Sequence, residues 1–189
     1  MKIATLTAII VFAFCFAETA IVFETTFNEL PAGWFNSEWL FSSSYAYICE
    51  SVFETGTFEA DMYTNGQPPI YYFVPDGTDS LVIHIGHDIA MYGTNGNAFV
   101  RLYSTSFDSV NIFNEWVHYD SYYSSDPIHH VIVDPPPDTW IGFRFHGYIS
   151  ATYPSGSTIN WWVYNLTVTA HGDELALEPG TWASIKNSF

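Results

Sequence analysis

The chain has 189 residues and carries 20 acidic residues against four lysines and arginines, a formal net charge of −16 at pH 7. Such an acidic chain is a poor partner for nucleic acid or for an anionic membrane surface, because both repel negative charge. Hydrophobic residues make up 48% of the chain and aromatic residues 19%, which is enough apolar material for the core of one domain.

The first segment has the outline of a secretory signal peptide. Met1-Lys2 precedes an apolar run from Ile3 to Ala17, with a small residue at the cleavage point. This run is shorter than the roughly 20 apolar residues of a membrane-spanning helix. We therefore expect a helical signal peptide at 1–17, no membrane span, and a protein that is secreted, either extracellular or at the cell surface. Phe14 stands where a lipidated Cys15 would need a small residue, which disfavours a lipoprotein.

Removal of residues 1–17 would leave Cys49 as the one cysteine, so no internal disulfide could form. Its apolar neighbours in the segment 45–52 predict a small buried hydrophobic side chain rather than a reactive thiol. Three basic residues would remain against 20 acidic ones, a charge near −17, and they are Arg101, Arg144 and Lys186.

Short strand-like runs, rich in aromatic and β-branched residues, follow one another with turns rich in Gly, Pro, Asn and Asp between them. The runs are 21–27, 45–52, 56–64, 70–74, 81–92, 98–105, 110–119, 128–133, 140–149 and 159–170. No long helical periodicity, internal repeat or linker interrupts them. The pattern predicts an all-β, antiparallel jelly-roll β-sandwich as a single domain at 18–177.

The last two runs predict the centre of the core, as a long hairpin around a Pro/Gly loop at 153–158. In 140–149 the alternation places Ile141, Phe143, Phe145 and Ile149 on one face. In 159–170 we expect Trp162, Tyr164, Leu166 and Val168 to share a face, with Asn160, Asn165, Thr167 and Thr169 on the other.

The tail at 178–189 departs from the strand pattern. Thr181 could cap a short helix that places Trp182, Ile185 and Phe189 on one side. This stripe could dock on the sandwich or on a partner, which would make the chain a structural, assembly or adhesion module. A frayed terminus is the alternative.

Three short motifs lie along the domain, and they are Phe23–Phe27 with Leu30–Trp34, Asp79–Ile83, and Trp161–Val168. Together they resemble motifs of the choice-of-anchor J domain and of related carbohydrate-binding modules of secreted bacterial proteins. Tyr164 stands where that family more often has an acidic residue. The resemblance implies a jelly-roll sandwich that attaches to surfaces or binds glycans, usually without catalysis.

Glu59 and Asp61 share a strand face in 56–64, as the paired carboxylates of a retaining glycosidase would. Sandwich glucanases, which this segment resembles, place a third acid where Tyr63 stands here. Since no other catalytic motif is present, we expect no enzyme activity, with a concanavalin-like glycoside hydrolase as the alternative.

The side chains that could bind a metal ion do not point toward one common position. Alternation sends His84 and Asp88 to one face and His87 to the other, and adjacent His129 and His130 also point apart. We therefore expect no zinc site and no cofactor. Structural calcium is left open, with donors that could include Glu24, Asp76 and Asp79.

The second face of 140–149 carries the candidate ligand-binding residues, which are Trp140, Arg144, His146 and Tyr148. Rings offer flat apolar platforms to sugars, and Arg and His offer hydrogen bonds to hydroxyl groups. Cross-strand pairing of Arg144 with an acid is the structural alternative. The sequence thus predicts a secreted module that binds carbohydrate or another cell-surface ligand, and it leaves the ligand and the oligomeric state open.

Overall fold

The computed structural model describes residues 18–64, 72–93, 95–105, 110–117, 122–173 and 175, with backbone alone at 110–117. The expected signal peptide and the tail at 178–189 lie outside the described residues, and both stay predictions. Within the described ranges, no helix is long and apolar enough to cross a membrane.

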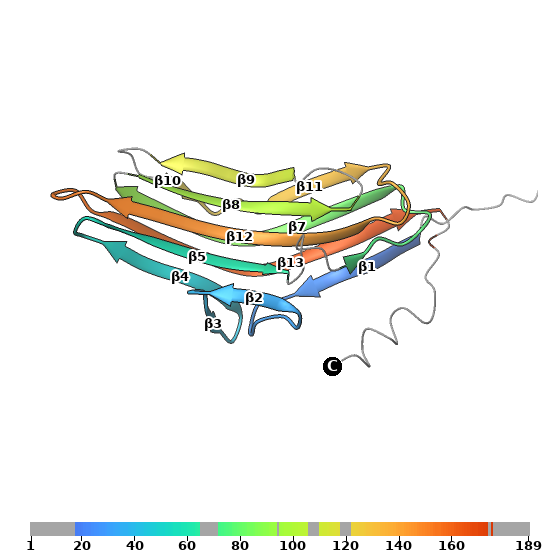
Figure 1. Ribbon diagram of the computed structural model, residues 1–189. Coiled ribbons are helices and arrows are strands. Elements are labelled where there is room, and N and C mark those ends of the chain that lie inside the picture. The colour runs from blue at the N-terminus through green and yellow to red at the C-terminus, as the bar shows by residue number, and fades with distance from the viewer. Residues whose placement is uncertain are drawn as a thin grey trace, which may run out of the picture.

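Thirteen strands occupy the described residues. They are β1 (Glu18–Thr25), β2 (Trp34–Ser37), β3 (Leu40–Ser42), β4 (Tyr45–Val52), β5 (Gly56–Thr64), β6 (Tyr72–Phe73), β7 (Ser80–Gly93), β8 (Asn95–Ser104), β9 (Val110–Val117), β10 (Tyr122–Ser124), β11 (Ile128–Val133), β12 (Trp140–Ala151) and β13 (Ser157–Gly172). All of their pairings are antiparallel. The long strands curve along their length (Figure 1).

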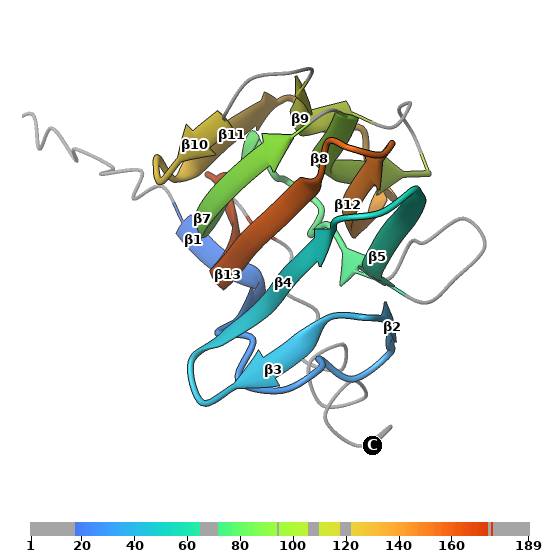
Figure 2. The same cartoon turned by 90° about the vertical axis from the view of Figure 1, so that its left-hand side faces the viewer.

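Two sheets pack face to face, as Figure 2 shows for β7, β13 and β4 in one layer and β5, β12 and β8 in the other. The six-stranded sheet has the order β2-β5-β12-β8-β9, with β6 also paired to β12. The seven-stranded sheet has the order β10-β7-β13-β4-β3, with β1 on β13 and β11 on β7. The predicted antiparallel jelly-roll sandwich is confirmed.

The core lies between the sheets and is built by alternation along each strand. In β12 the inward residues Ile141, Phe143, Phe145 and Ile149 are 0–1% exposed, as predicted. Phe145 meets Trp161 of the opposite sheet at 6.2 Å between ring centroids, and Trp39 stands 5.1 Å from Trp161. These rings join the two layers, so the inner faces are apolar and each outer face is available for polar chemistry.

The predicted hairpin between 140–149 and 159–170 is wrong. β12 pairs with β5 and β8, whereas β13 pairs with β7, β4 and β1, so the loop between them crosses from one sheet to the other. Alternation shows which side chains face the core, but it is the same for two strands of one hairpin and for two strands that face each other across a core. The central position of both runs is confirmed.

A β-bulge in β13 changes the phase of its alternation. The register to β7 shifts between Val163 and Asn165, with Tyr164 as the extra residue. Trp161, Val163, Leu166 and Val168 are therefore buried together. The prediction was right for Leu166 and Val168 and wrong for Trp162 and Tyr164, which lie half-buried on the outer face.

Three short strands, β2, β3 and β10, were not predicted because three or four residues are too few to show a period. Cys49 was also placed wrongly. It lies exposed on the outer face of β4, where its Sγ donates to Asn160 Oδ1 at 2.9 Å.

Candidate functional site

The outer face of the six-stranded sheet carries polar and aromatic side chains in register. One row crosses four strands in the order Phe35, Tyr63, Arg144 and Arg101. The neighbouring row has Ser37, Asp61, His146 and Phe99. Adjacent strands lie about 4.8 Å apart, so side chains of one row are direct neighbours. The two rows bring β2, β5, β12 and β8 to one site.

A bidentate ion pair stands at the centre of this site. Arg144 donates from Nε to Asp61 Oδ1 at 2.6 Å and from Nη2 to Asp61 Oδ2 at 2.7 Å. The side chain of Asp61 is 15% exposed and that of Arg144 is 30% exposed. Burial alone would raise the pKa of Asp61, but hydrogen bonds from His146 and Arg144 and the positive charge of Arg144 outweigh it and lower the pKa to about 2. Asp61 is therefore ionised at neutral pH.

The same pair raises the pKa of Arg144 above its ordinary value, chiefly through the hydrogen bonds to Asp61 and against the opposing effect of burial. A side-chain hydrogen bond to Tyr103 adds to this effect. Arg144 is thus a permanent cation whose guanidinium group is held by Asp61 on one side and by Tyr103 on the other. A guanidinium held in this way keeps its direction when a ligand arrives.

His146 supports the pair from below. Its side chain stacks on Phe99, with ring centroids 4.7 Å apart and planes inclined at 24°. Its Nδ1 lies 3.1 Å from Asp61 Oδ1 and 3.7 Å from Glu59 Oε1. His146 is only 8% exposed, so it positions Asp61 more than it offers itself to solvent.

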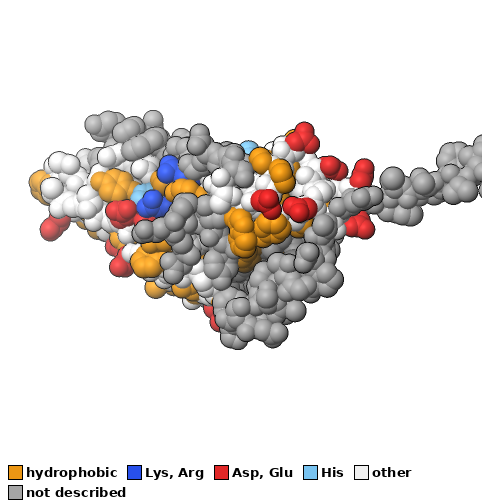
Figure 3. Space-filling view, turned by 45° about the vertical axis from the view of Figure 1, so that its right-hand side comes forward, with side chains coloured by type: hydrophobic (Ala, Val, Ile, Leu, Met, Phe, Trp, Pro, Cys, Tyr) orange, Lys and Arg blue, Asp and Glu red, His pale blue; other side chains and the backbone are white. Residues whose placement is uncertain are grey.

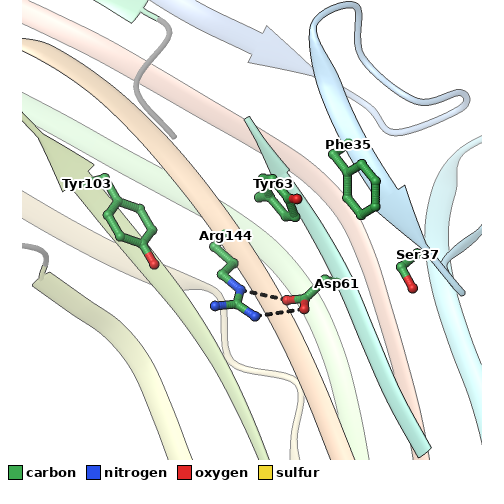
Figure 4. Close-up of a pocket in the computed structure, with 6 residues that line it drawn as sticks. All are labelled: Phe35, Ser37, Asp61, Tyr63, Tyr103 and Arg144. Atoms are coloured by element: carbon green, nitrogen blue, oxygen red, sulfur yellow. Dashed lines mark hydrogen bonds and ion pairs between the residues drawn. The ribbon is translucent and has the colours of Figure 1, made fainter. Parts of the chain in front are cut away.

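A cleft of about 390 Å³ lies beside the pair and is lined by Phe35, Ser37, Asp61, Tyr63, Tyr103 and Arg144. In Figure 4 the guanidinium of Arg144 lies between Tyr103 and Asp61, with the rings of Tyr63 and Phe35 next to each other on β5 and β2. Those two rings are 4.8 Å apart with planes at 30°. Figure 3 shows the basic side chains gathered beside a histidine and bordered by hydrophobic groups. The cleft thus combines ring surfaces with a fixed charged pair.

The four residues predicted for ligand binding do share this outer face of β12, but they do not form one cluster. Arg144 lines the cleft, and His146 lies beneath the pair. Tyr148 stands in the next row, opposite Glu59. Trp140 is 43% exposed and packs on Phe73 at 5.3 Å, four residues and about 13 Å along the strand from Arg144. Ligand binding by these four residues stays a prediction.

Sequence reasoning missed Phe35, Ser37, Tyr63 and Tyr103 as ligand-binding residues. Phe35 and Ser37 lie on β2, a strand too short to be predicted. Tyr103 lies in a run that was predicted, and its alternation with Arg101 and Phe99 could have indicated a common face. Cross-strand pairing of Arg144 with an acid, given as the structural alternative, is present as the bond to Asp61.

Metal binding does not fit this cluster. Glu59, Asp61 and His146 hold three ligand atoms within 4.8 Å of one another, the one such group within the described residues. However, Arg144 already bonds both oxygens of Asp61, so an added cation would meet a guanidinium directly. Glu24, Asp76 and Asp79, the acids considered for calcium, are exposed.

The histidines of β7 and β11 follow the predicted alternation. His84 and Asp88 lie on the outer face, whereas His87 is buried, and this burial lowers its pKa despite nearby Asp88 and Asp126. His84 meets His129 across the strands at 6.3 Å between ring centroids. No third metal-ligating side chain joins them within the part of the chain that the structure describes.

No protein-family model and no curated protein matches the chain, so the resemblance to choice-of-anchor J domains stays an expectation. Among solved structures, the chain is similar to a family 29 carbohydrate-binding module complexed with mannohexaose, with 13% identity, 81% of this chain and 92% of that chain covered, and a TM-score of 0.34. A mutant of this module complexed with cellulohexaose is 14% identical, with 81% of this chain and 91% of that chain covered and a TM-score of 0.31. Another mutant of the module is 12% identical, with 92% of this chain and 99% of that chain covered and a TM-score of 0.35. TM-scores this low give no grounds for assigning the ligand or the function of those modules to this chain.

Proposed function

We propose that the chain is a secreted, non-catalytic module that binds carbohydrate through the cleft on the outer face of the six-stranded sheet. The observation that carries this proposal is the bidentate pair of Arg144 and Asp61 set among the rings of Phe35, Tyr63 and Tyr103. Export is supported by the signal-like segment at 1–17 alone.

Sugars present an apolar C–H face and a rim of hydroxyl groups, and the cleft offers a counterpart to both. Tyr63 and Phe35 form a double ring platform on which a pyranose can stack. Asp61 accepts hydrogen bonds from hydroxyl groups, while Arg144 and Ser37 can donate to them. Since Arg144 and Asp61 are already held by each other, they lose little conformational entropy when a sugar binds.

The electrostatics of Asp61 support binding rather than catalysis. A general acid must carry a proton at working pH, and a carboxyl group with a pKa of about 2 does not. The charge-assisted bonds that both oxygens of Asp61 accept from Arg144 also make this carboxylate a poor nucleophile. Glu59 is exposed beside Asp61. Turnover of a β-glucan by the wild type that is lost in Glu59→Gln would instead support the glycosidase alternative.

The test is a glycan array, followed by calorimetry on Tyr63→Ala with Tyr123→Ala as the matched control. Tyr123 is 67% exposed on β10, in the other sheet, so its loss should leave affinity unchanged. Tyr63→Ala should weaken binding about tenfold, because a ring stack contributes about 0.5–1.5 kcal/mol beyond area burial. Trp140→Ala shows whether the ligand extends along β12. Absence of binding to every glycan, or equal effects of the two tyrosine variants, would remove this face from consideration.

A further inference from the structure

The outer face of the seven-stranded sheet carries aromatic rings next to a carboxylate. Tyr47 on β4, Trp162 on β13 and Asp88 on β7 are direct cross-strand neighbours in this order. Figure 2 shows these three strands side by side. Adjacent strands lie about 4.8 Å apart, so the side chains of Trp162 and Asp88 lie next to each other. All three side chains are half-buried, which leaves part of each in contact with solvent.

Two further tyrosines extend this row. The ring of Tyr45 lies 5.6 Å from that of Tyr47, with planes at 70°. Tyr164 lies 6.2 Å from Tyr45, with planes at 86°. We refer to Tyr45, Tyr47, Trp162, Tyr164 and Asp88 as the aromatic patch. Because its neighbouring tyrosine rings are steeply inclined to one another, the patch presents ring faces in several directions instead of one flat surface.

The carboxylate of the aromatic patch is held by a neutral partner. The hydroxyl group of Tyr164 donates to Oδ2 of Asp88. Burial raises the pKa of Tyr164, and the bond to Asp88 and the charge of Asp88 raise it further, to about 12, so this hydroxyl group stays protonated at neutral pH. A neutral donor leaves the negative charge of Asp88 in place, whereas Arg144 compensates the charge of Asp61 on the opposite face.

The charge of the sheet around the patch is negative. Its seven strands contain no lysine and no arginine, and their acidic residues are Glu18, Glu24, Glu50 and Asp88. The whole chain has a formal net charge of −16. Such a surface raises the local concentration of positively charged ligands and repels anions. A cation therefore complements this face in charge.

We propose that the aromatic patch binds a quaternary ammonium group. This inference goes beyond the proposed carbohydrate binding, because it concerns the opposite face of the sandwich and another class of ligand. A quaternary ammonium group carries a diffuse positive charge on an apolar surface, and the faces of aromatic rings attract it, that of Trp most strongly. A group placed on the ring of Trp162 lies one strand spacing from Asp88. Since it has no hydrogen to donate, it leaves the bond between Tyr164 and Asp88 intact.

Two other classes of ligand fit the patch less well. A calcium ion requires six to eight oxygen ligands, and no group of three His, Cys, Asp or Glu side chains that includes Asp88 converges within the described ranges. A sugar ring stacks best on a flat platform such as Phe35 and Tyr63, whose planes meet at 30°. The angles of 70° and 86° in the aromatic patch suit a compact, rounded group.

The first experiment compares choline with its neutral isostere, in which a carbon atom replaces the nitrogen. Calorimetry on the full chain should show choline binding about tenfold more tightly, with a difference that falls as salt rises, because the charge is what distinguishes the two. Ethanolamine, the primary amine, should bind more weakly than choline because its ammonium group is more strongly hydrated. Equal binding of choline and the isostere, or no binding of choline, would overturn the proposal.

The second experiment uses Trp162→Leu, with Trp140→Leu as the matched control. Trp162→Leu should weaken choline binding about tenfold. Trp140 is 43% exposed on β12, in the other sheet, so its replacement should leave choline binding unchanged. Equal effects of the two variants would place the ammonium group elsewhere.

Two further variants separate the charge of Asp88 from its hydrogen bond. Asp88→Asn should weaken choline and leave the isostere unaffected, whereas Tyr164→Phe should keep choline affinity within about twofold, because the ring and the charge both remain. Calcium chloride that displaces choline, when sodium chloride of equal ionic strength does not, would show a carboxylate site for metal ions and overturn the proposal. So would unchanged choline affinity in Asp88→Asn. These comparisons decide the matter even where Trp162→Leu fails to fold.

Discussion

The two outer faces of the sandwich are similar in layout and different in chemistry. Each has a carboxylate near the middle, held by a side chain from an adjacent strand and surrounded by rings. On the six-stranded sheet Arg144 holds Asp61. On the seven-stranded sheet the hydroxyl group of Tyr164 donates to Asp88. Tyr45 lies beside Tyr164 there, with ring centroids 6.2 Å apart.

The difference lies in the charge of the partner. Arg144 and its hydrogen bonds help to lower the pKa of Asp61 to about 2, against the effect of burial. On the other face, burial and the bond to Asp88 raise the pKa of Tyr164 to about 12. Both arginines of the described residues belong to the six-stranded sheet, Arg101 on β8 and Arg144 on β12. Two faces with similar aromatic and polar residues thus differ in charge, because the carboxylate of each is bonded to a different residue on the neighbouring strand.

The largest expected difference appears when each carboxylate loses its partner. Arg144→Met should lower the free energy of unfolding by about 1–3 kcal/mol, because it leaves a mostly buried charge without its cation, partly offset by solvent. Tyr164→Phe removes one hydrogen bond and should cost about 1 kcal/mol or less. Urea unfolding measures both changes.

The control for this pair is the double variant Arg144→Met/Asp61→Asn, which no longer leaves a charge behind. It should recover part of the stability that Arg144→Met loses, as expected for residues that interact directly. Equal losses in Arg144→Met and Tyr164→Phe would show that the two faces hold their carboxylates equally strongly, contrary to the comparison above.

A smaller difference should appear in the pH dependence, with opposite signs on the two faces. The pKa of Asp61 is about 2 when folded and about 3.9 in an unfolded chain. Its contribution, about 1–2 kcal/mol after allowance for solvent, is complete above pH ~5 and is lost as the pH falls through about 2. The pKa of Tyr164 is about 12 when folded, so its contribution is present below pH ~10 and is lost as the pH rises through about 12.

Urea midpoints of the wild type, Asp61→Asn and Tyr164→Phe across this range test the two signs. Asp61→Asn should flatten the acid limb only, and Tyr164→Phe the alkaline limb only. An alkaline limb that is unchanged in Tyr164→Phe would mean that other tyrosines, and not the bond to Asp88, determine it.

The smallest effect is expected at Cys49, which marks the seven-stranded face. In a Cys15→Ser background its exposed thiol should react with a thiol reagent in the folded state. Cys49→Ser should change the free energy of unfolding by less than about 0.5 kcal/mol. A label on Cys49 should leave glycan affinity unchanged, whereas a label on Ser37→Cys in the cleft should reduce it. Equal loss from both labels would place the ligand elsewhere.

The sequence by itself determined the longer strands and the inward side of most of them. Three of the predicted runs coincide with β4, β5 and β11, because each run carries its own alternation and is bounded by turn residues. The same alternation placed Arg144 and His146 on an outer face and Phe143 and Phe145 in the core. These properties are local, since they depend on a period of two residues along one strand.

Only the tertiary structure decided which strands are neighbours. Asp61 and Arg144 are 83 positions apart, and nothing in either strand shows that β5 lies beside β12, or that β12 and β13 belong to different sheets. The bulge at Tyr164 and the short strand that brings Phe35 to the cleft are likewise invisible to a local pattern. The physical reason is that the backbone hydrogen bonds of a sheet join different strands, and no pattern within one strand specifies its neighbour. The register, and with it the ion pair of Arg144 and Asp61, is therefore set only when the sheets assemble.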